Sequence, residues 1–270
     1  DQLVEQPAIG LFAALGWQTL CAMEETFGPS PPAPLPKGEG RISLGRETRG
    51  EVVLVERLRA ALEKFNPTLP PEAISNAIDE LIRDRSAMSL EAANREVYKL
   101  LKEGIAVSVP DREHGGQKTE RLRVIDWQHP ENNDFLLVSQ FSVTGSLYTC
   151  RPDLVGFVNG LPWVVIELKK PGVPSRNAFD ENLTHYKQQI PALFWYNALL
   201  IASNGTDSRV GSLTADWGRF FEWKRIERED EPCRVSLEVM LRGTCDRTRL
   251  LDLVENFTLF SEHKAGLVKI

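Results

Sequence analysis

Two short apolar runs, joined by a tight-turn signal, constrain the fold of this 270-residue chain more than any other feature. The runs are DLVGFV at 153–158 and WVVIEL at 163–168, and Asn159-Gly160-Leu161-Pro162 stands between them. An Asn-Gly pair between two strand-like runs is a strong hairpin signal, because both residues tolerate the positive φ angles of a tight turn. The sequence therefore predicts two antiparallel strands that fold back on each other here.

The rest of the chain predicts helices before and after a compact run of strands. Apolar residues at spacings of three and four indicate helices over 1–23, most of 51–103, 176–189 and 247–262. Short apolar runs indicate further strands at 122–127, 135–143 and 198–203. Ser89 is the expected N-cap of the last helix before the strands, and Gly104 is its expected end. This order predicts an α/β fold: a mixed β-sheet flanked by helices, with an extra helical segment.

We expect residues 1–270 to form one domain with three parts. A loop insert spans 24–50, because the run GPSPPAPLPKGEG contains five prolines and three glycines. A helical segment spans 51–104, and the sheet core with the hairpin spans 105–270. The chain begins at Asp1 rather than at a methionine, so we expect it to be a segment of a longer protein.

Charge and cysteine content narrow the class of protein. The net charge is −6, which excludes a strongly basic nucleic-acid binder but permits a local basic groove. No apolar stretch approaches the ~20 residues of a membrane-spanning helix, so we expect no membrane partner.

The four cysteines form no Cys-x-x-Cys pair, so we expect reduced thiols in a cytoplasmic protein and no zinc site. They are Cys21, Cys150, Cys233 and Cys245.

The hairpin brings three chemically active side chains to one edge of the predicted sheet. Asp153 begins one strand and Glu167 ends the next, so their carboxylates can meet at the open end of the hairpin. Glu167 and Lys169 are two residues apart, so their side chains point to one face, while Leu168 points to the core. The sequence therefore predicts that two carboxylates and one ammonium converge.

This trio suits metal-dependent hydrolysis of a phosphodiester. Mg²⁺ prefers oxygen ligands and keeps several waters, so Asp153, Glu167 and the Leu168 carbonyl are the expected ligands, with Mn²⁺ as an alternative cation. The metal would neutralise charge on the scissile phosphate and lower the pKa of a bound water. Lys169 would position the attacking water and stabilise the developing negative charge.

A Glu-x-Lys triplet alone carries little information. The chain contains two more, Glu222-x-Lys224 and Glu262-x-Lys264, and neither follows a Pro-Asp pair and a hairpin. A solvated ion pair at a strand end therefore stays an alternative for the trio. The strand is otherwise apolar and ends in a carboxylate and a lysine, which favours a functional site over a solvated ion pair.

Pro152-Asp153 followed by Glu167-Leu168-Lys169 resembles the PD-(D/E)xK nuclease motif. The wider sequence is similar to the N-terminal nuclease domain of the restriction (R) subunit of type I restriction enzymes. The similar segments are VEQPAIGLFAALGW, NNDFLLVSQFSV, RPDLVGFVNGLPWVVIELKKP, YKQQIPALFWYNALLIASNGTDSRVGS and LLDLVENFTLF. The resemblance covers most of the chain, is weakest over 24–90, and implies the restriction-endonuclease-like PD-(D/E)xK fold.

The resemblance also implies auxiliary residues. The family carries Gln-x-x-x-Tyr on the helix after the Glu-x-Lys strand, and here Asn182 and Tyr186 occupy these positions, on one helical face. Many nucleases of this fold place a glutamate of the first helix near the metal, and Glu5 is the candidate by position. A solvated first-turn glutamate that interacts with the helix dipole is an equal alternative for Glu5. Lys170 is expected to contact a DNA phosphate, unless it is simply solvated.

The resemblance implies a Mg²⁺-dependent endodeoxyribonuclease that cuts double-stranded DNA without reading its sequence. Its partners would be the modification and specificity subunits of a type I restriction complex. ATP would be used only by a motor domain, which we expect to be absent because no Gly-x-x-x-x-Gly-Lys-Ser/Thr loop occurs. Two alternatives stay open: a catalytically degenerate DNA-binding or coupling module, which Asn182 in place of Gln motivates, and a stand-alone nuclease of a repair or defence system.

Overall fold

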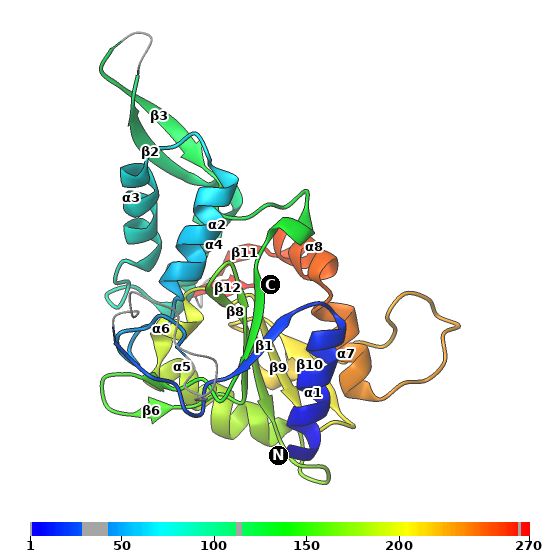
Figure 1. Ribbon diagram of the computed structural model, residues 1–270. Helices are drawn as coiled ribbons and strands as arrows, with labels where there is room; N and C mark the ends of the chain where they lie inside the picture. Colours follow the sequence, from blue (N-terminus) through cyan, green and yellow to red (C-terminus); the bar gives the residue numbers. More distant parts are fainter. Residues whose placement is uncertain (1, 29–42, 112–114, 264–265) are drawn as a thin grey trace, which may run out of the picture.

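The computed structural model describes residues 2–28, 43–111, 115–263 and 266–270. A mixed sheet lies at its centre, with its strands in the order β1-β4-β7-β8-β9-β10 (Figure 1). The strands are β1 (Gln18–Cys21), β4 (Phe135–Ser139), β7 (Leu154–Val158), β8 (Leu161–Leu168), β9 (Leu199–Ser203) and β10 (Ser208–Gly211). The β1–β4 and β8–β9 pairs are parallel, and the other neighbours are antiparallel. The predicted α/β class with a mixed sheet is confirmed.

The predicted hairpin forms the middle of this sheet. Asn159 and Gly160 make its turn, with φ angles of 50° and 78°, and Val158 pairs with Leu161 beside it. All residues of β7 and β8 are buried, which explains why both strands read as apolar runs. A Cβ atom at Gly160 would lie 2.4 Å from the Leu54 carbonyl oxygen, so the turn packs directly against a neighbouring backbone.

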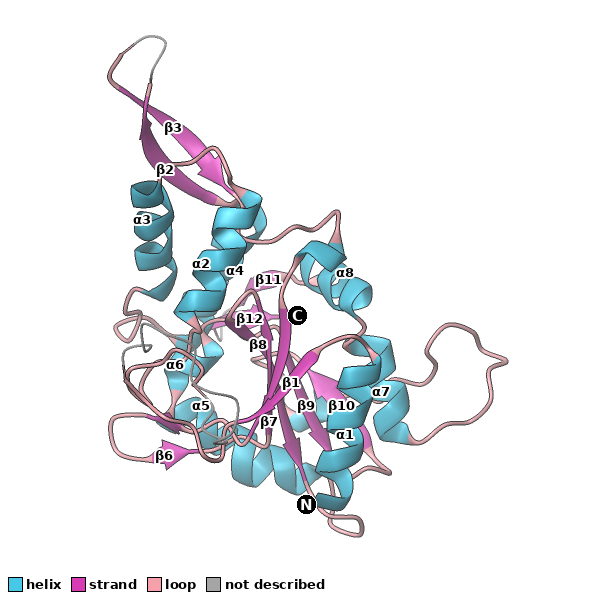
Figure 2. Ribbon diagram, in the orientation of Figure 1, coloured by secondary structure: helices cyan, strands magenta, loops and turns pink. Residues whose placement is uncertain are grey.

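Helices flank the sheet (Figure 2). The helices α1 (Gln2–Ala14) and α7 (Ser236–Thr244) lie side by side, with α1 against β1 and β4 and α7 against β10. The π-helix η2 (Ala178–Leu183) packs against β8 and β9 and continues into α5 (Thr184–Gln189). The helix predicted over 176–189 is therefore confirmed, with its first part wound as a π-helix.

The helix predicted over 1–23 ends early. It stops at Ala14, and Gly16, with a φ of 83°, turns the chain into β1. Trp17 fits the helical spacing, yet its ring packs edge-on against Phe12 and Phe135 from beyond the helix end. The prediction is wrong after Ala14. Trp17 keeps the helical spacing, but it packs into the core from the segment that leads into β1.

The predicted helical segment consists of α2 (Val55–Phe65), α3 (Pro71–Ile82) and α4 (Leu90–Glu103). The Ser89 hydroxyl caps α4 by accepting a hydrogen bond from the Ala92 backbone N–H, as predicted. Gly104 ends this helix with a φ of 76°, also as predicted. The extra helical segment expected from the sequence is thus present.

A hairpin of β2 (Ile105–Pro110) and β3 (Gln117–Leu122) extends from the helical segment, away from the central sheet (Figure 1). The strand predicted at 122–127 is wrong, because β3 ends at Leu122 and the chain then leaves the ladder. The buried residues of β2 are branched and apolar, and they alternate with exposed Ala106, Ser108 and Pro110; this alternation is a strand signal that the prediction missed.

The ends of two other predicted elements also differ. The strand predicted over 135–143 breaks after Ser139, and a short pair of β5 (Val143–Thr144) and β6 (Thr149–Cys150) follows. The helix predicted to residue 262 ends earlier, because α8 (Arg247–Phe257) gives way to β11 (Phe260–His263), which pairs with β12 (Gly266–Lys269). The remaining short helices are η1 (Pro130–Asn132), α6 (Pro191–Phe194) and η3 (Trp217–Arg219).

Most of the loop insert predicted at 24–50 lies outside the described residues, and its described flanks contain no helix. Across the described ranges, every helix is too short or too polar to cross a membrane. All four cysteines are free thiols, as predicted, and Cys150 and Cys245 are buried.

Candidate active site

The two predicted carboxylates meet at the open end of the hairpin. Asp153 immediately precedes β7, and Glu167 is the penultimate residue of β8. Glu167 Oε2 accepts a hydrogen bond from the Asp153 backbone N–H at 3.4 Å, and Asp153 Oδ2 accepts one from the Leu168 backbone N–H at 2.8 Å. Each carboxylate thus binds the backbone of the opposite strand, which fixes both side chains at this edge of the sheet.

Burial dominates the electrostatics of this pair. Glu167 is only 4% exposed, and burial raises its pKa well above the usual range, with the Asp153 carboxylate adding to the rise. Burial also raises the pKa of Asp153, against the opposing effect of its hydrogen bond from the Leu168 N–H. Both shifts favour protonation, so a cation bound beside the two carboxylates would restore their ionised forms.

Two helical residues connect Lys169, which directly follows β8, to Glu167. Lys169 Nζ donates to Asn182 Oδ1 at 2.7 Å, and the Asn182 amide donates to the Tyr186 hydroxyl at 3.3 Å. The Tyr186 hydroxyl donates to Glu167 Oε1 at 3.4 Å, and burial raises the pKa of that hydroxyl. Lys169 also forms an ion pair with Glu181, which the sequence prediction did not include. Leu168 is buried between the two strand residues, as predicted.

Glu5 lies in a groove of about 570 Å³ that Asp153, Arg151 and Gln140 also line. It is 7% exposed, so the alternative of a solvated first-turn glutamate is wrong. The Gln140 side-chain amide donates to both carboxylate oxygens of Glu5, each at 3.2 Å. The structure therefore brings Glu5 to the same groove as Asp153, and it adds Gln140 and Arg151 to the site.

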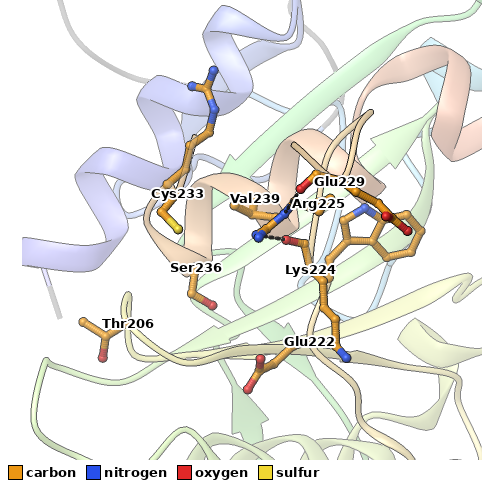
Figure 3. Close-up of a pocket in the computed structure, with 10 residues that line it drawn as sticks. Thr206, Glu222, Lys224, Arg225, Glu229, Cys233, Ser236 and Val239 are labelled. Atoms are coloured by element: carbon orange, nitrogen blue, oxygen red, sulfur yellow. Dashed lines mark hydrogen bonds between the residues drawn. The ribbon is translucent and has the colours of Figure 1, made fainter. Parts of the chain in front are cut away.

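Lys170 is exposed directly after the Glu-x-Lys strand, where a bound phosphate could reach it. A second Glu-x-Lys triplet lies elsewhere, on a cavity of about 770 Å³ (Figure 3). Glu222 and Lys224 line that cavity together with residues of the loop before α7, and Arg225 donates to the Lys224 and Glu229 carbonyls. None of the described residues predicted for the active site lines this cavity. The cavity therefore does not mark the predicted active site, although it is larger than the groove beside Asp153.

The donor set fits a divalent cation that takes few protein ligands. In the described part of the chain, no three His, Cys, Asp or Glu side chains are grouped closely enough to hold a metal ion by themselves. Asp153 and Glu167 instead form a pair of carboxylates, with Glu5 outside any such group. Mg²⁺ commonly takes one or two carboxylates and completes its coordination with waters and substrate phosphates. Two convergent carboxylates are therefore a sufficient anchor.

Known proteins have sequences similar to this one over much of its length. The family model described as "Type I restriction enzyme R protein N terminus" matches residues 1–219. The type I restriction enzyme HindI endonuclease subunit of Haemophilus influenzae is 36% identical over 97% of this chain and 24% of its own length. The EcoprrI endonuclease subunit of Escherichia coli is 29% identical over 56% of this chain and 50% of its own length. The chain thus spans about a quarter of the length of the first relative and half of the second.

Proposed function

Because this chain belongs to the family of type I restriction enzyme R protein N termini, we propose that it is a nuclease domain that hydrolyses the phosphodiester bonds of double-stranded DNA. The observation that carries this proposal is the pair of carboxylates, half-buried Asp153 and buried Glu167, within the electrostatic reach of the Lys169 ammonium at the open end of one hairpin. The mixed sheet flanked by helices is compatible with the PD-(D/E)xK nuclease fold, and we propose that the trio corresponds to the motif of that fold.

Asp153 and Glu167 would hold Mg²⁺ or Mn²⁺, with the Leu168 carbonyl as a further oxygen donor and Glu5 adding its negative charge from the groove that it shares with Asp153. When bound, the cation supplies charge neutralisation at the scissile phosphate and an acidified water. The backbone N–H groups of Asp153 and Leu168 orient the two carboxylates before any ligand arrives. Such preorganisation lowers the cost of assembling the site around DNA.

Lys169 would orient the attacking water and stabilise the negative charge that develops on the phosphate. Asn182 and Tyr186 hold the ammonium and the Glu167 carboxylate in a fixed relation, through the hydrogen bonds described above. Asn182 has a shorter side chain than the glutamine of the family motif, yet its amide reaches both neighbours. This contact supports an intact site over a degenerate DNA-binding module.

The greater length of the relatives supports a role within a longer subunit. We propose that sequence recognition comes from modification and specificity subunits in the cytoplasm, and that ATP serves a motor domain outside this chain. The net charge of −6 predicts weak, salt-sensitive DNA binding by the chain alone, with Lys170 contacting a phosphate. Attachment to a motor on DNA would raise the effective concentration of substrate at the site.

Nicking of supercoiled plasmid DNA at low salt tests the proposal. We expect the 270-residue chain to nick the plasmid with Mg²⁺ or Mn²⁺ and to stop when EDTA removes the cation. If the chain alone does not cut, the same assay is run with a full-length R subunit that contains it, assembled with its partners. Absence of cation-dependent cleavage in both assays would contradict the proposed function.

A further inference from the structure

Gln140 adopts a backbone conformation that L-amino acids rarely take. Its φ is 59°, and Asn159 in the hairpin turn is the one other non-glycine residue with a positive φ in the described ranges. Asparagine is common at such turn positions, whereas glutamine has no local hydrogen bond that favours them. Residues held in disfavoured conformations cluster at functional sites, where surrounding contacts maintain them.

The contacts of Gln140 connect the Glu5 carboxylate to the backbone of Asp153. Its backbone N–H donates to the Asp153 carbonyl at 2.9 Å, just after β4 ends. Its side-chain Nε2 donates to both oxygens of Glu5, each at 3.2 Å. Gln140 therefore joins α1, which carries Glu5, to the start of β7, where Asp153 lies. All three residues line one groove.

The chemistry of the Gln140 side chain suits a site that attracts a cation. A lysine or arginine at this position would hold Glu5 equally well, but it would cancel the negative charge of Glu5. The neutral amide orients the carboxylate and preserves its charge. Glycine would satisfy the backbone conformation with less strain, but it would leave Glu5 without this donor.

We propose that Gln140 is a positioning residue that holds Glu5 beside Asp153, so that Glu5 contributes its negative charge to the binding of a divalent cation in the groove. This inference rests on the proposed function, because it assigns Gln140 a part in the same cation site. Gln140 acts through Glu5, to which its side-chain amide donates.

The test is a double-mutant cycle of Gln140→Gly and Glu5→Gln in the 270-residue chain, read by calorimetric titration with Mn²⁺ alone. Loss of an outer-shell partner of a metal site typically weakens metal affinity about 10- to 100-fold. We expect each single variant to bind Mn²⁺ roughly tenfold more weakly than wild type. We expect the double variant to bind no more weakly than Glu5→Gln, because Gln140 acts through Glu5.

Thermal unfolding without metal separates positioning from a structural role. Glycine is the residue that a positive φ favours, so Gln140→Gly is expected to unfold at or above the wild-type temperature while binding Mn²⁺ more weakly. If Gln140→Gly binds Mn²⁺ with wild-type affinity, or if the losses of affinity add up in the double variant, the inference about Gln140 is overturned. The proposed function is not affected by either result. A wild-type chain that binds no Mn²⁺ would overturn the proposed metal site, and this inference with it.

Discussion

The Glu167 carboxylate accepts a hydrogen bond from the backbone N–H of Asp153 across the hairpin, at 3.4 Å. The Asp153 carboxylate is held in turn by the backbone N–H that follows Glu167. The hairpin ladder thus sets the separation of the two acids, and no side chain needs to bridge them. Two like charges are placed together where Glu167 is buried and Asp153 is half-buried, and this is costly unless a cation or protons compensate.

Glu167→Gln tests this cost directly. Burial raises the pKa of Glu167, so the folded chain binds this proton more tightly than the unfolded chain, whose pKa is near 4.5. The wild type therefore loses stability as the pH rises from 4.5 through the raised pKa. Each unit of that rise is worth about 1.4 kcal/mol, so we expect Glu167→Gln to stabilise the metal-free chain at neutral pH while abolishing cleavage. Urea unfolding in EDTA measures the first effect, and a less stable variant would contradict it.

Tyr186→Phe removes the hydroxyl that joins Asn182 to Glu167. We expect cleavage to slow roughly tenfold, as for other residues that orient a metal ligand. We expect stability to change by about 1 kcal/mol or less, because the hydroxyl makes only long hydrogen bonds, of 3.3 to 3.5 Å. Single-turnover cleavage rates measure the first effect. An unchanged rate would show that the contact of Tyr186 with Glu167 does not support the reaction.

Gly160→Ala tests the packing of the hairpin turn. The new Cβ would lie 2.4 Å from the Leu54 carbonyl oxygen, and the residue has a φ of 78°. Gly115→Ala is a matched control, because Gly115 has a φ of 72° and no atom of the described residues within 4 Å of the Cβ position. We expect the control to cost about 1–2 kcal/mol from its backbone conformation alone. We expect Gly160→Ala to cost about 1–3 kcal/mol more from overpacking, measured by denaturant unfolding. Equal losses would contradict the close packing.

Lys269→Met tests a buried lysine away from the site. Burial lowers the pKa of Lys269 to about 7, from 10.5, and its ammonium donates to Asn94 Oδ1 and the Asn197 carbonyl. Between these two pH values the unfolded chain binds a proton that the folded chain does not, so this lysine makes stability rise with pH. The rise is at most about 1.4 kcal/mol per pH unit and should be absent in Lys269→Met. Parallel pH dependences of urea unfolding in the two proteins would contradict the shift.

The sequence predicted the hairpin and its carboxylates because their signals are local. The Asn159-Gly160 turn starts the pairing of the two strands, and a register shift between Gly156 and Phe157 then pairs Leu154 with Ile166, the neighbours of the two acids. Lys169 follows from the two-residue period of a strand. These positions needed no knowledge of how distant segments pack.

Other features depend on contacts between distant segments. Gln140 and Glu5 are 135 residues apart, and neither the positive φ of Gln140 nor its amide contact has a local sequence signal. The end of the first helix at Ala14 was missed because Trp17 kept the helical spacing while packing against Phe135. Both features are set by tertiary packing, so they could not be predicted from the local sequence pattern.

Replacement of Lys169 tests the central claim most directly. Lys169→Ala is compared with Lys224→Ala, which removes the exposed lysine of the second Glu-x-Lys triplet. Lys169→Ala removes an ion pair with Glu181, which is 60% exposed, and the hydrogen bond to Asn182, so we expect the free energy of unfolding to fall by about 1–3 kcal/mol and the chain to stay folded. We expect the wild type and Lys224→Ala to nick supercoiled plasmid equally with Mg²⁺ or Mn²⁺, and Lys169→Ala to be at least about 100-fold slower. Nicking by Lys169→Ala at the wild-type rate would contradict the account.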